Sequence, residues 1–305
     1  MLSLEKEAWE ICQRQTGFFP TTIGVQVLRE KFELDQKTAV YLHQVQTILE
    51  QDFLDLPKIY LTFPKEKTTA LPVVLYLHGG QFMRGSFQSY QKIVSEIAAR
   101  AQVCVVFIEY SLAPEAKAPI QQNEIADVYQ HLTKLAAKYA LDLGRLILVG
   151  DDVGANFAVH LAAKANLALP IYKMVLLTPV LNANFDTTSY YSFAGGYDLT
   201  REQMKWVWQQ YLGTGVADVA RFCALRLAQE QLQYLPKTLI VTAEADVVRD
   251  EGEALARKLR DCGVQVAQVR FQGIIHDFLI KNELDKTNAC RLAMNLVIDW
   301  IKKKS

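Results

Sequence analysis

The chain has 305 residues, of which 50% are apolar and 22% charged, so it can bury a large core and is not a disordered, collagen-like or coiled-coil protein. Its 33 Lys and Arg residues balance 33 Asp and Glu residues, and this zero net charge excludes a nucleic-acid binder that relies on a basic surface. The five cysteines are scattered without zinc-site spacing, so the sequence predicts no metal site and favours a reducing compartment.

Residues 1–50 have a helical pattern and no evident strand partner. The segment Met1–Glu7 lacks the basic and apolar regions of a secretory signal. No later run approaches the roughly 18 apolar residues of a membrane span. We therefore expect a soluble, cytoplasmic protein.

From residue 51 onward, short apolar runs alternate with longer amphipathic segments. The short runs predict buried strands at Lys58–Phe63, Val73–Leu77, Val103–Ile108, Leu146–Val149, Met174–Thr178, Leu239–Thr242 and Val266–Phe271. The longer segments predict helices at Tyr90–Arg100, Ile120–Tyr139, Val153–Ala165, Glu251–Cys262 and Asp285–Lys303. This alternation predicts an α/β fold with a mostly parallel sheet flanked by helices. The first run alternates more between polar and apolar residues, and we expect it to form an antiparallel edge hairpin with Val73–Leu77.

Residues 183–216 interrupt the alternation with many aromatic side chains, among them Phe193, Tyr197 and Trp208. Ligands of such sheets bind beyond the carboxyl ends of the strands, so an insertion after a strand could form a lid over a site. Alternatively, its aromatic side chains pack on the core.

One turn has the pattern small–x–nucleophile–x–small after a strand and before a helix. It runs from Gly150 through Asp151, Asp152 and Val153 to Gly154, and the two glycines suit the crowded backbone of a strained turn. Its central residue is Asp152, where a serine would be expected.

Three more polar groups follow strands. His78, Gly79 and Gly80 end an apolar run and resemble a loop whose backbone N–H groups face an oxyanion. Asp246 and His276 follow two later strands, which gives the chain order nucleophile, acid, base.

Together these motifs resemble the hormone-sensitive-lipase type of α/β hydrolase over nearly the whole chain. The matching segments are His78–Gly80, Tyr110–Glu115 (similar to YRLAPE), Gly150–Asn156 (similar to GDSAGGN), Phe193–Trp208 (similar to the cap helix), Asp246–Glu251 (similar to DPLRDE) and Ile275–Phe278 (similar to IHGF). The resemblance implies an α/β-hydrolase fold, with a core at 51–305 and a helical cap formed by 1–50 and about 183–216. It further implies hydrolysis of small, short-chain carboxylic esters without a metal or cofactor, and by analogy a homodimer.

Carried over to this sequence, the resemblance makes Asp246 the acid and His276 the base. The oxyanion donors would be the backbone N–H groups of Gly80, Gln81 and Val153, although Gln81 replaces a glycine of the motif. Supporting residues would be His78, Gly79, Gly150, Asp151 and Gly154, and the pocket would be lined by Phe82, Met83, Phe193, Tyr197 and Trp208.

Asp152 changes the expected chemistry, because a carboxylate has no hydroxyl proton for His276 to remove and is a poor nucleophile toward esters. Ordinary serine-esterase turnover should be lost or very low. Three hypotheses follow. The chain could be an inactivated hydrolase of small esters, or a sensory protein that binds a small ester or apolar ligand, as in the similar gibberellin receptors. It could also be an enzyme that uses Asp152 as its nucleophile, as haloalkane dehalogenases and epoxide hydrolases do. Two carboxylates beside His276 would also favour imidazolium.

Other polar residues have simpler interpretations. We expect His43, His131 and His160 to be structural. Glu244 and Asp277 would satisfy loops or lie at the pocket rim, and Asp250 and Glu251 would favour the start of a helix.

Overall fold

The computed structural model describes residues 2–14, 24–53, 55–66, 70–164 and 167–304. Among these, eight strands form one sheet in the order β1-β2-β4-β3-β5-β6-β7-β8. The pairs β1–β2 and β2–β4 are antiparallel, and the other neighbours are parallel. The strands are β1 (Val45–Glu50), β2 (Lys58–Pro64), β3 (Leu71–Leu77), β4 (Cys104–Glu109), β5 (Leu141–Asp151), β6 (Ile171–Leu177), β7 (Lys237–Ala245) and β8 (Val266–Ile275). This mostly parallel sheet confirms the predicted fold class.

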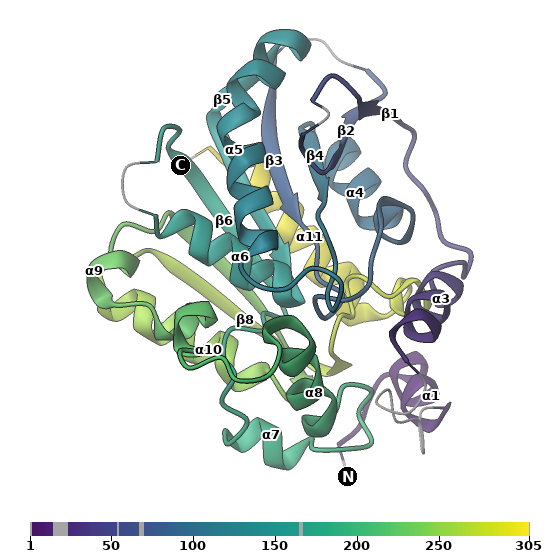
Figure 1. Cartoon of the computed structure of the whole chain (residues 1–305). Helices are drawn as coiled ribbons and strands as arrows, with labels where there is room; N and C mark the ends of the chain where they lie inside the picture. The colour runs from purple at the N-terminus through teal and green to yellow at the C-terminus, as the bar shows by residue number, and fades with distance from the viewer. Residues whose placement is uncertain (1, 15–23, 54, 67–69, 165–166, 305) are drawn as a thin grey trace.

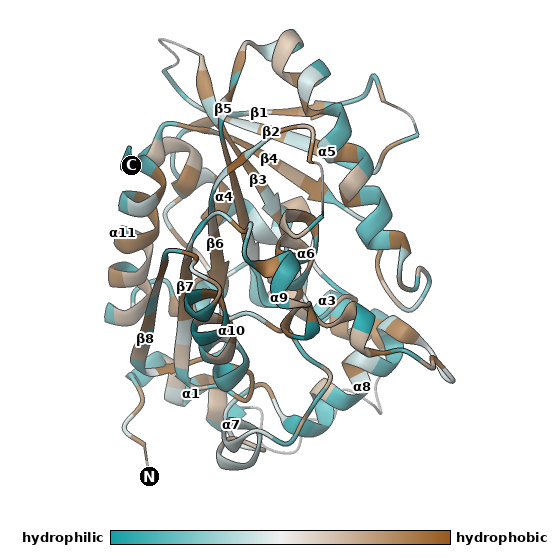
Figure 2. Ribbon diagram, turned by 90° about the vertical axis from the view of Figure 1, so that its left-hand side faces the viewer, coloured by the Kyte–Doolittle hydropathy of each residue, from teal (hydrophilic) through white to brown (hydrophobic). Residues whose placement is uncertain are grey.

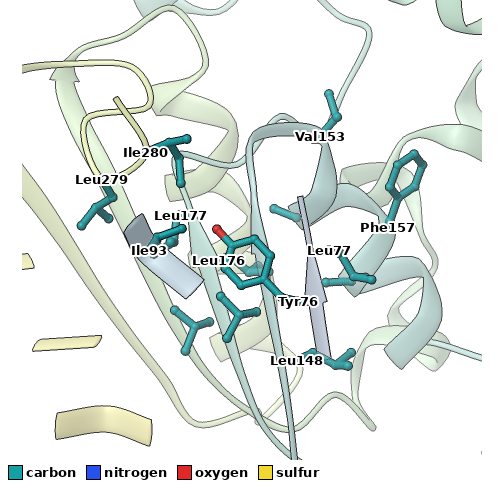
Figure 3. Close-up of a cluster of buried hydrophobic side chains, with 14 of the residues drawn as sticks. Tyr76, Leu77, Ile93, Leu148, Val153, Phe157, Leu176, Leu177, Leu279 and Ile280 are labelled. Carbon is teal, nitrogen blue, oxygen red and sulfur yellow. The ribbon is translucent and has the colours of Figure 1, made fainter. Parts of the chain in front are cut away.

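Each of the seven predicted strands overlaps an observed one, because burial on both faces requires a continuous apolar run. All seven residues of β3 are buried, as are the last six of β5. Figure 3 shows Leu77, Leu148 and Leu176 of three neighbouring strands within the same buried cluster. The first five residues of β5 are not buried, so the apolar pattern revealed only the second half of that strand.

Two sequence predictions about the sheet edge are wrong. Residues 1–50 are not purely helical, since Val45–Glu50 forms β1 and pairs along its whole length with β2. β2 does not form a hairpin with β3, because β4 lies between them. The β-branched residues of β1 suit a strand, but only pairing with β2 reveals it.

Helices cover both faces of the sheet (Figure 1). α4 (Phe87–Ala101) and α11 (Asn288–Lys302) pack together on one face, and α5 (Ile120–Tyr139), α6 (Asp152–Ala162) and α10 (Arg249–Asp261) lie on the other. Figure 2 shows the strands as the most hydrophobic layer, with hydrophilic residues on the outer sides of the helices. The sheet is therefore the centre of the core.

Helix starts follow capping residues more closely than apolar periodicity. Ser86 accepts a hydrogen bond from Ser89 N and begins α4 three residues before the expected Tyr90. Thr287 accepts from Cys290 N and begins α11 three residues after the expected Asp285. The predicted end of a helix at residue 165 lies outside the described residues.

Four helices of the described part of the chain lie beyond the carboxyl ends of the strands (Figure 1): α1 (Lys6–Arg14), α3 (Val25–Asp35), α7 (Thr188–Ser192) and α8 (Arg201–Leu212). The first two come from the N-terminal segment and the last two from the aromatic insertion. Tyr190, Phe193, Trp208 and Tyr211 of this insertion are buried, whereas Tyr191 is exposed. The insertion thus packs most of its aromatic side chains inward while it covers the strand ends.

None of the helices in the described part of the chain combines the length and the apolar character that a membrane crossing needs.

Candidate active site

A sharp turn joins β5 to α6 and presents Asp152 at the start of the helix. β5 ends at Asp151, α6 begins at Asp152, and Asp152 has a φ of 47°. A Cβ on Gly154 would lie 2.0 Å from Leu77 O, and a Cβ on Gly150 would lie 2.5 Å from Gly154 O. Both glycines are therefore required by close backbone approach, as the spacing predicted.

His276 follows β8 and lies beside Asp246, which follows β7. His276 Nδ1 donates to Asp246 Oδ2 across 2.8 Å, and Val248 N donates to Asp246 Oδ1 across 3.0 Å. This bond orients the ring so that Nε2 faces Asp152, whose Oδ1 is 3.6 Å away. Asp152 lies 94 residues before Asp246 in the sequence and His276 lies 30 residues after it, yet the three side chains meet at the carboxyl edge of the sheet.

The loop after β3 reaches the other oxygen of Asp152. Gln81 N donates to Asp152 Oδ2 across 2.6 Å, although Gln81 has a φ of 57°, a conformation that favours glycine. Gly80 has no room for a side chain, because a Cβ there would lie 2.1 Å from Arg84 O. Of the three expected oxyanion donors, the Gln81 N–H is the one bonded to Asp152. Val153, the third, follows Asp152 in the first turn of α6.

Asp277 belongs to this cluster, which the sequence interpretation missed. Its Oδ1 lies 3.3 Å from His276 Nε2, its side chain is 3% exposed, and Thr178 Oγ1 lies 3.4 Å from the same oxygen. It is therefore not a rim residue. The sequence did contain a signal for this role, because Asp277 stands where the IHGF-like motif has a glycine. Asp277 also has a φ of 58°, in the region that favours glycine. Glu244, by contrast, accepts a bond from Gly273 N and satisfies its loop.

The charges around His276 favour imidazolium. Burial lowers the pKa of His276, but the carboxylates of Asp246, Asp277 and Asp152 raise it well above its ordinary value. Burial raises the pKa of Asp152, but His276 and the Gln81 N–H lower it overall. Asp152 is therefore a carboxylate beside a cation, and His276 is a weak general base near neutral pH.

Asp151 anchors the glycine loop to the turn. It accepts hydrogen bonds from Tyr76 OH, Tyr90 OH and Gly79 N at 2.9–3.0 Å. A Cβ on Gly79 would lie 2.5 Å from Asp151 Oδ2. The loop thus lies directly against the turn.

His78 supports the same loop by packing. Its ring stacks on Tyr110 at 4.1 Å and on Phe107 at 5.2 Å between centroids. Burial lowers the pKa of His78 to about 4, so the ring is neutral. Tyr110 OH donates to His78 O across 2.6 Å, which fixes the loop from the other side.

Glu251 does not act mainly at the start of a helix, contrary to the sequence interpretation. It is fully buried, and its Oε2 accepts from Leu181 N at 2.5 Å and Asn182 N at 2.8 Å, while Oε1 accepts from Tyr190 OH at 2.9 Å. Burial raises the pKa of Glu251 to about 8. Its role is to join α10 to the segment after β6 and to the aromatic insertion.

A cavity of about 210 Å³ lies between the N-terminal helices and the core, next to Gln81. Its walls are both apolar and charged, and they comprise Ile11, Arg14, Leu28, Lys31, Phe32, Asp35, Gln36, Gln81, Arg84, Asp198, Leu199, Gln203, Lys281, Asn282 and Glu283. Among the residues that the structure describes, three ion pairs line it, namely Arg14–Glu283, Lys31–Asp35 and Lys281–Asp198. A larger hollow of about 1140 Å³ lies beside the far half of α6 and contains none of the residues described above as the site.

The five residues expected to line a pocket do not line this cavity. Among the described residues that line the cavity beside Gln81, none is Phe82, Met83, Phe193, Tyr197 or Trp208. Phe82 is fully buried, stacked on Tyr211 with 3.8 Å between ring centroids and 5.3 Å from Trp208. Phe82 therefore packs within a cluster of aromatic side chains, and the cavity wall combines residues of α1 and α3 with residues of the core and of the insertion.

Comparison with known proteins agrees with this architecture. A family model described as α/β hydrolase fold matches residues 74–280. A putative α/β hydrolase of Acanthamoeba polyphaga mimivirus is 40% identical over 79% of this chain and 70% of that protein, and an ethyl acetate hydrolase of Pseudomonas putida is 32% identical over 73% and 70%. A crystal structure of a thermostable esterase from Pseudomonas putida is 31% identical, with a TM-score of 0.89 over 98% of this chain and 97% of that one.

Proposed function

We propose that this chain, which belongs to the α/β-hydrolase fold family in its hormone-sensitive-lipase and esterase branch, keeps the ester-binding site of these proteins. In this proposal Asp152, at the position of the nucleophile, suppresses serine-type ester hydrolysis. The ligand would be a small ester or apolar molecule that enters the cavity beside Gln81.

The observation that supports this proposal is the engagement of both Asp152 oxygens. Oδ2 accepts the Gln81 N–H that a substrate oxyanion would need, and Oδ1 faces His276 Nε2. A substrate carbonyl must therefore compete with a buried carboxylate for its stabilising donor. Asp152 also has no hydroxyl proton to transfer, and attack by its carboxylate on an ester would only form an anhydride.

The test is hydrolysis of p-nitrophenyl acetate and butyrate by three forms of the protein. The unsubstituted chain should give rates near background, and Asp152→Ser should exceed it by about 10³-fold or more, since loss of a triad member typically costs ~10⁴- to 10⁶-fold. Asp152→Asn is the matched control, because it keeps the side-chain shape without a hydroxyl or a charge, and it should stay inactive. Turnover by the unsubstituted chain comparable to that of Asp152→Ser would contradict the proposal.

One observation favours a second candidate function. Asp152 Oδ1 makes no hydrogen bond within the described residues, whereas Oδ2 is held by Gln81 N. A carboxylate held in this way could attack an sp³ carbon through Oδ1, forming a C–O bond while a halide leaves with its electron pair. Incubation with a primary haloalkane should then add one alkyl group to the intact mass of the chain but not to Asp152→Asn, and a lack of both adduct and halide release excludes this candidate.

The expected homodimer and cytoplasmic location stay predictions. Size-exclusion chromatography with light scattering would test the first, and cell fractionation the second.

A further inference from the structure

Three metal-ligating side chains converge at the end of the sheet, and we propose that Asp152, His276 and Asp277 bind one zinc ion. His276 Nε2 lies 3.3 Å from Asp277 Oδ1 and 3.6 Å from Asp152 Oδ1, and one ligand atom from each of the three side chains lies within 4.8 Å of the others. The site goes beyond the proposed function and does not depend on it, because zinc binding can be measured without any substrate.

The spacing of these atoms suits a small ion with tetrahedral geometry. Ligand atoms about 2.0–2.1 Å from zinc lie roughly 3.3 Å apart at tetrahedral angles. One ligand atom from each side chain already lies within 4.8 Å of the others, so a modest inward movement of the carboxylates would place an ion between them and the imidazole. The three side chains are also buried, at 0%, 1% and 3% exposure for Asp152, His276 and Asp277, unlike an acidic cluster on a surface.

A second observation points to a ligand in the same gap. His276 Nε2 and Asp152 Oδ1 are buried atoms that have no hydrogen-bond partner among the described residues. Buried polar atoms are rarely left without a partner, since an unsatisfied one costs about 1–3 kcal/mol. The two atoms lie 3.6 Å apart, and a zinc ion between them would replace the Nε2 proton of the imidazolium, which leaves to solvent, so that one cation bonds both atoms.

Each ligand is held from outside the gap. Asp246 Oδ2 accepts from His276 Nδ1, the arrangement in which a carboxylate orients a metal-binding histidine. Gln81 N fixes Asp152 through Oδ2 and leaves Oδ1 for the ion. Thr178 Oγ1 lies near Asp277 Oδ1. These contacts would hold the ligand atoms in place before the ion arrives.

The donor set selects zinc among common divalent cations. One imidazole and two carboxylates neutralise its charge and give three protein ligands, with a fourth position left for water. Mg²⁺ and Ca²⁺ prefer six or more oxygen ligands, which this site lacks. The cavity of about 210 Å³ is lined by Gln81, whose N–H contacts Asp152, and so lies next to the site.

The experiment is a titration of chelator-treated protein with zinc chloride, followed by calorimetry, with metal content measured after gel filtration. Cobalt replaces zinc in a parallel sample, and its visible absorption reports tetrahedral coordination. The unsubstituted chain should bind one ion with micromolar or tighter affinity. Asp277→Gly, which suits the positive φ at this position, and His276→Asn should each weaken binding by at least about 100-fold, because even loss of an outer partner of a metal ligand costs 10- to 100-fold.

His131→Gln is the matched control, since it removes a histidine on α5 whose Nδ1 bonds Asp127 O, outside the cluster. It should bind zinc like the unsubstituted chain. Failure of the unsubstituted chain to take up one equivalent of zinc overturns the proposal, whatever the fold of the variants. Binding that survives both Asp277→Gly and His276→Asn in folded protein overturns it as well.

Discussion

Replacing Asp277 with glycine in an Asp152→Ser background should lower the pH at which ester hydrolysis reaches half of its maximum. A serine at this position needs a neutral His276 to accept its proton. Burial lowers the pKa of His276, but Asp246 and Asp277 more than offset it, so the ring holds its proton near neutral pH. Asp246 also orients the ring, whereas Asp277 only stabilises the charge on Nε2.

The magnitude follows from the distance between the two groups. Unit charges 3.3 Å apart interact by about 5 kcal/mol at an effective dielectric constant of ~20, and one pKa unit corresponds to about 1.4 kcal/mol. Water that enters the space left by the carboxylate reduces this effect. We therefore expect the midpoint to fall by about 1–3 pH units.

The assay is kcat/KM for p-nitrophenyl acetate between pH 5 and 10, with a chelator present to remove metal ions. Asp152→Ser should have an alkaline midpoint, and Asp152→Ser/Asp277→Gly should be the more active form at pH 7. Asp152→Ser/Asp277→Asn is the control for side-chain size and should shift in the same direction. Identical midpoints in the single and double variants would refute the electrostatic reasoning.

Three further predictions concern stability, measured by urea denaturation. Gly154→Ala should lower the free energy of unfolding by about 3 kcal/mol or more, because the new Cβ would lie 2.0 Å from Leu77 O. The control Gly195→Ala, whose Cβ would have nothing within 4 Å, should change this free energy by less than about 0.5 kcal/mol, and equal effects of the two substitutions would contradict the reasoning. Burial raises the pKa of Glu251 from 4.5 to about 8, so between these pH values the folded state keeps a proton that the unfolded state releases. The free energy of unfolding should therefore fall by up to about 1.4 kcal/mol per pH unit across that range. The same pH dependence of stability in a Glu251→Gln variant would argue against this cause. Phe82→Ala should cost about 3–5 kcal/mol if Phe82 is a core residue, and a loss below about 1 kcal/mol would count against that role.

Features that depend on a few consecutive residues could be predicted from the sequence. The turn from Gly150 to Gly154 is one example, because its glycines are required by backbone contacts within the turn and with the adjacent β3. Buried strands such as β3 are another, because a strand covered on both faces must be apolar throughout. These local signals led to the correct fold class and family.

Features that depend on the partners of a segment could not be predicted in the same way. The role of Val45–Glu50 depends on pairing with β2, and the wall of the cavity beside Gln81 combines residues of α1 and α3 with Lys281 and its neighbours. Side-chain contact between Asp277 and His276 likewise depends on how the loop after β8 turns toward Asp152.

The order of the motifs along the chain was therefore enough to identify a hydrolase scaffold and the unusual carboxylate at its turn, because local backbone geometry restricts which residues those positions accept. The number of carboxylates around His276, and hence its charge and its fitness to bind a metal ion, was decided by tertiary structure. The reason is that Coulomb and ligand interactions depend on distances of a few ångströms between groups that spacing along the chain does not define.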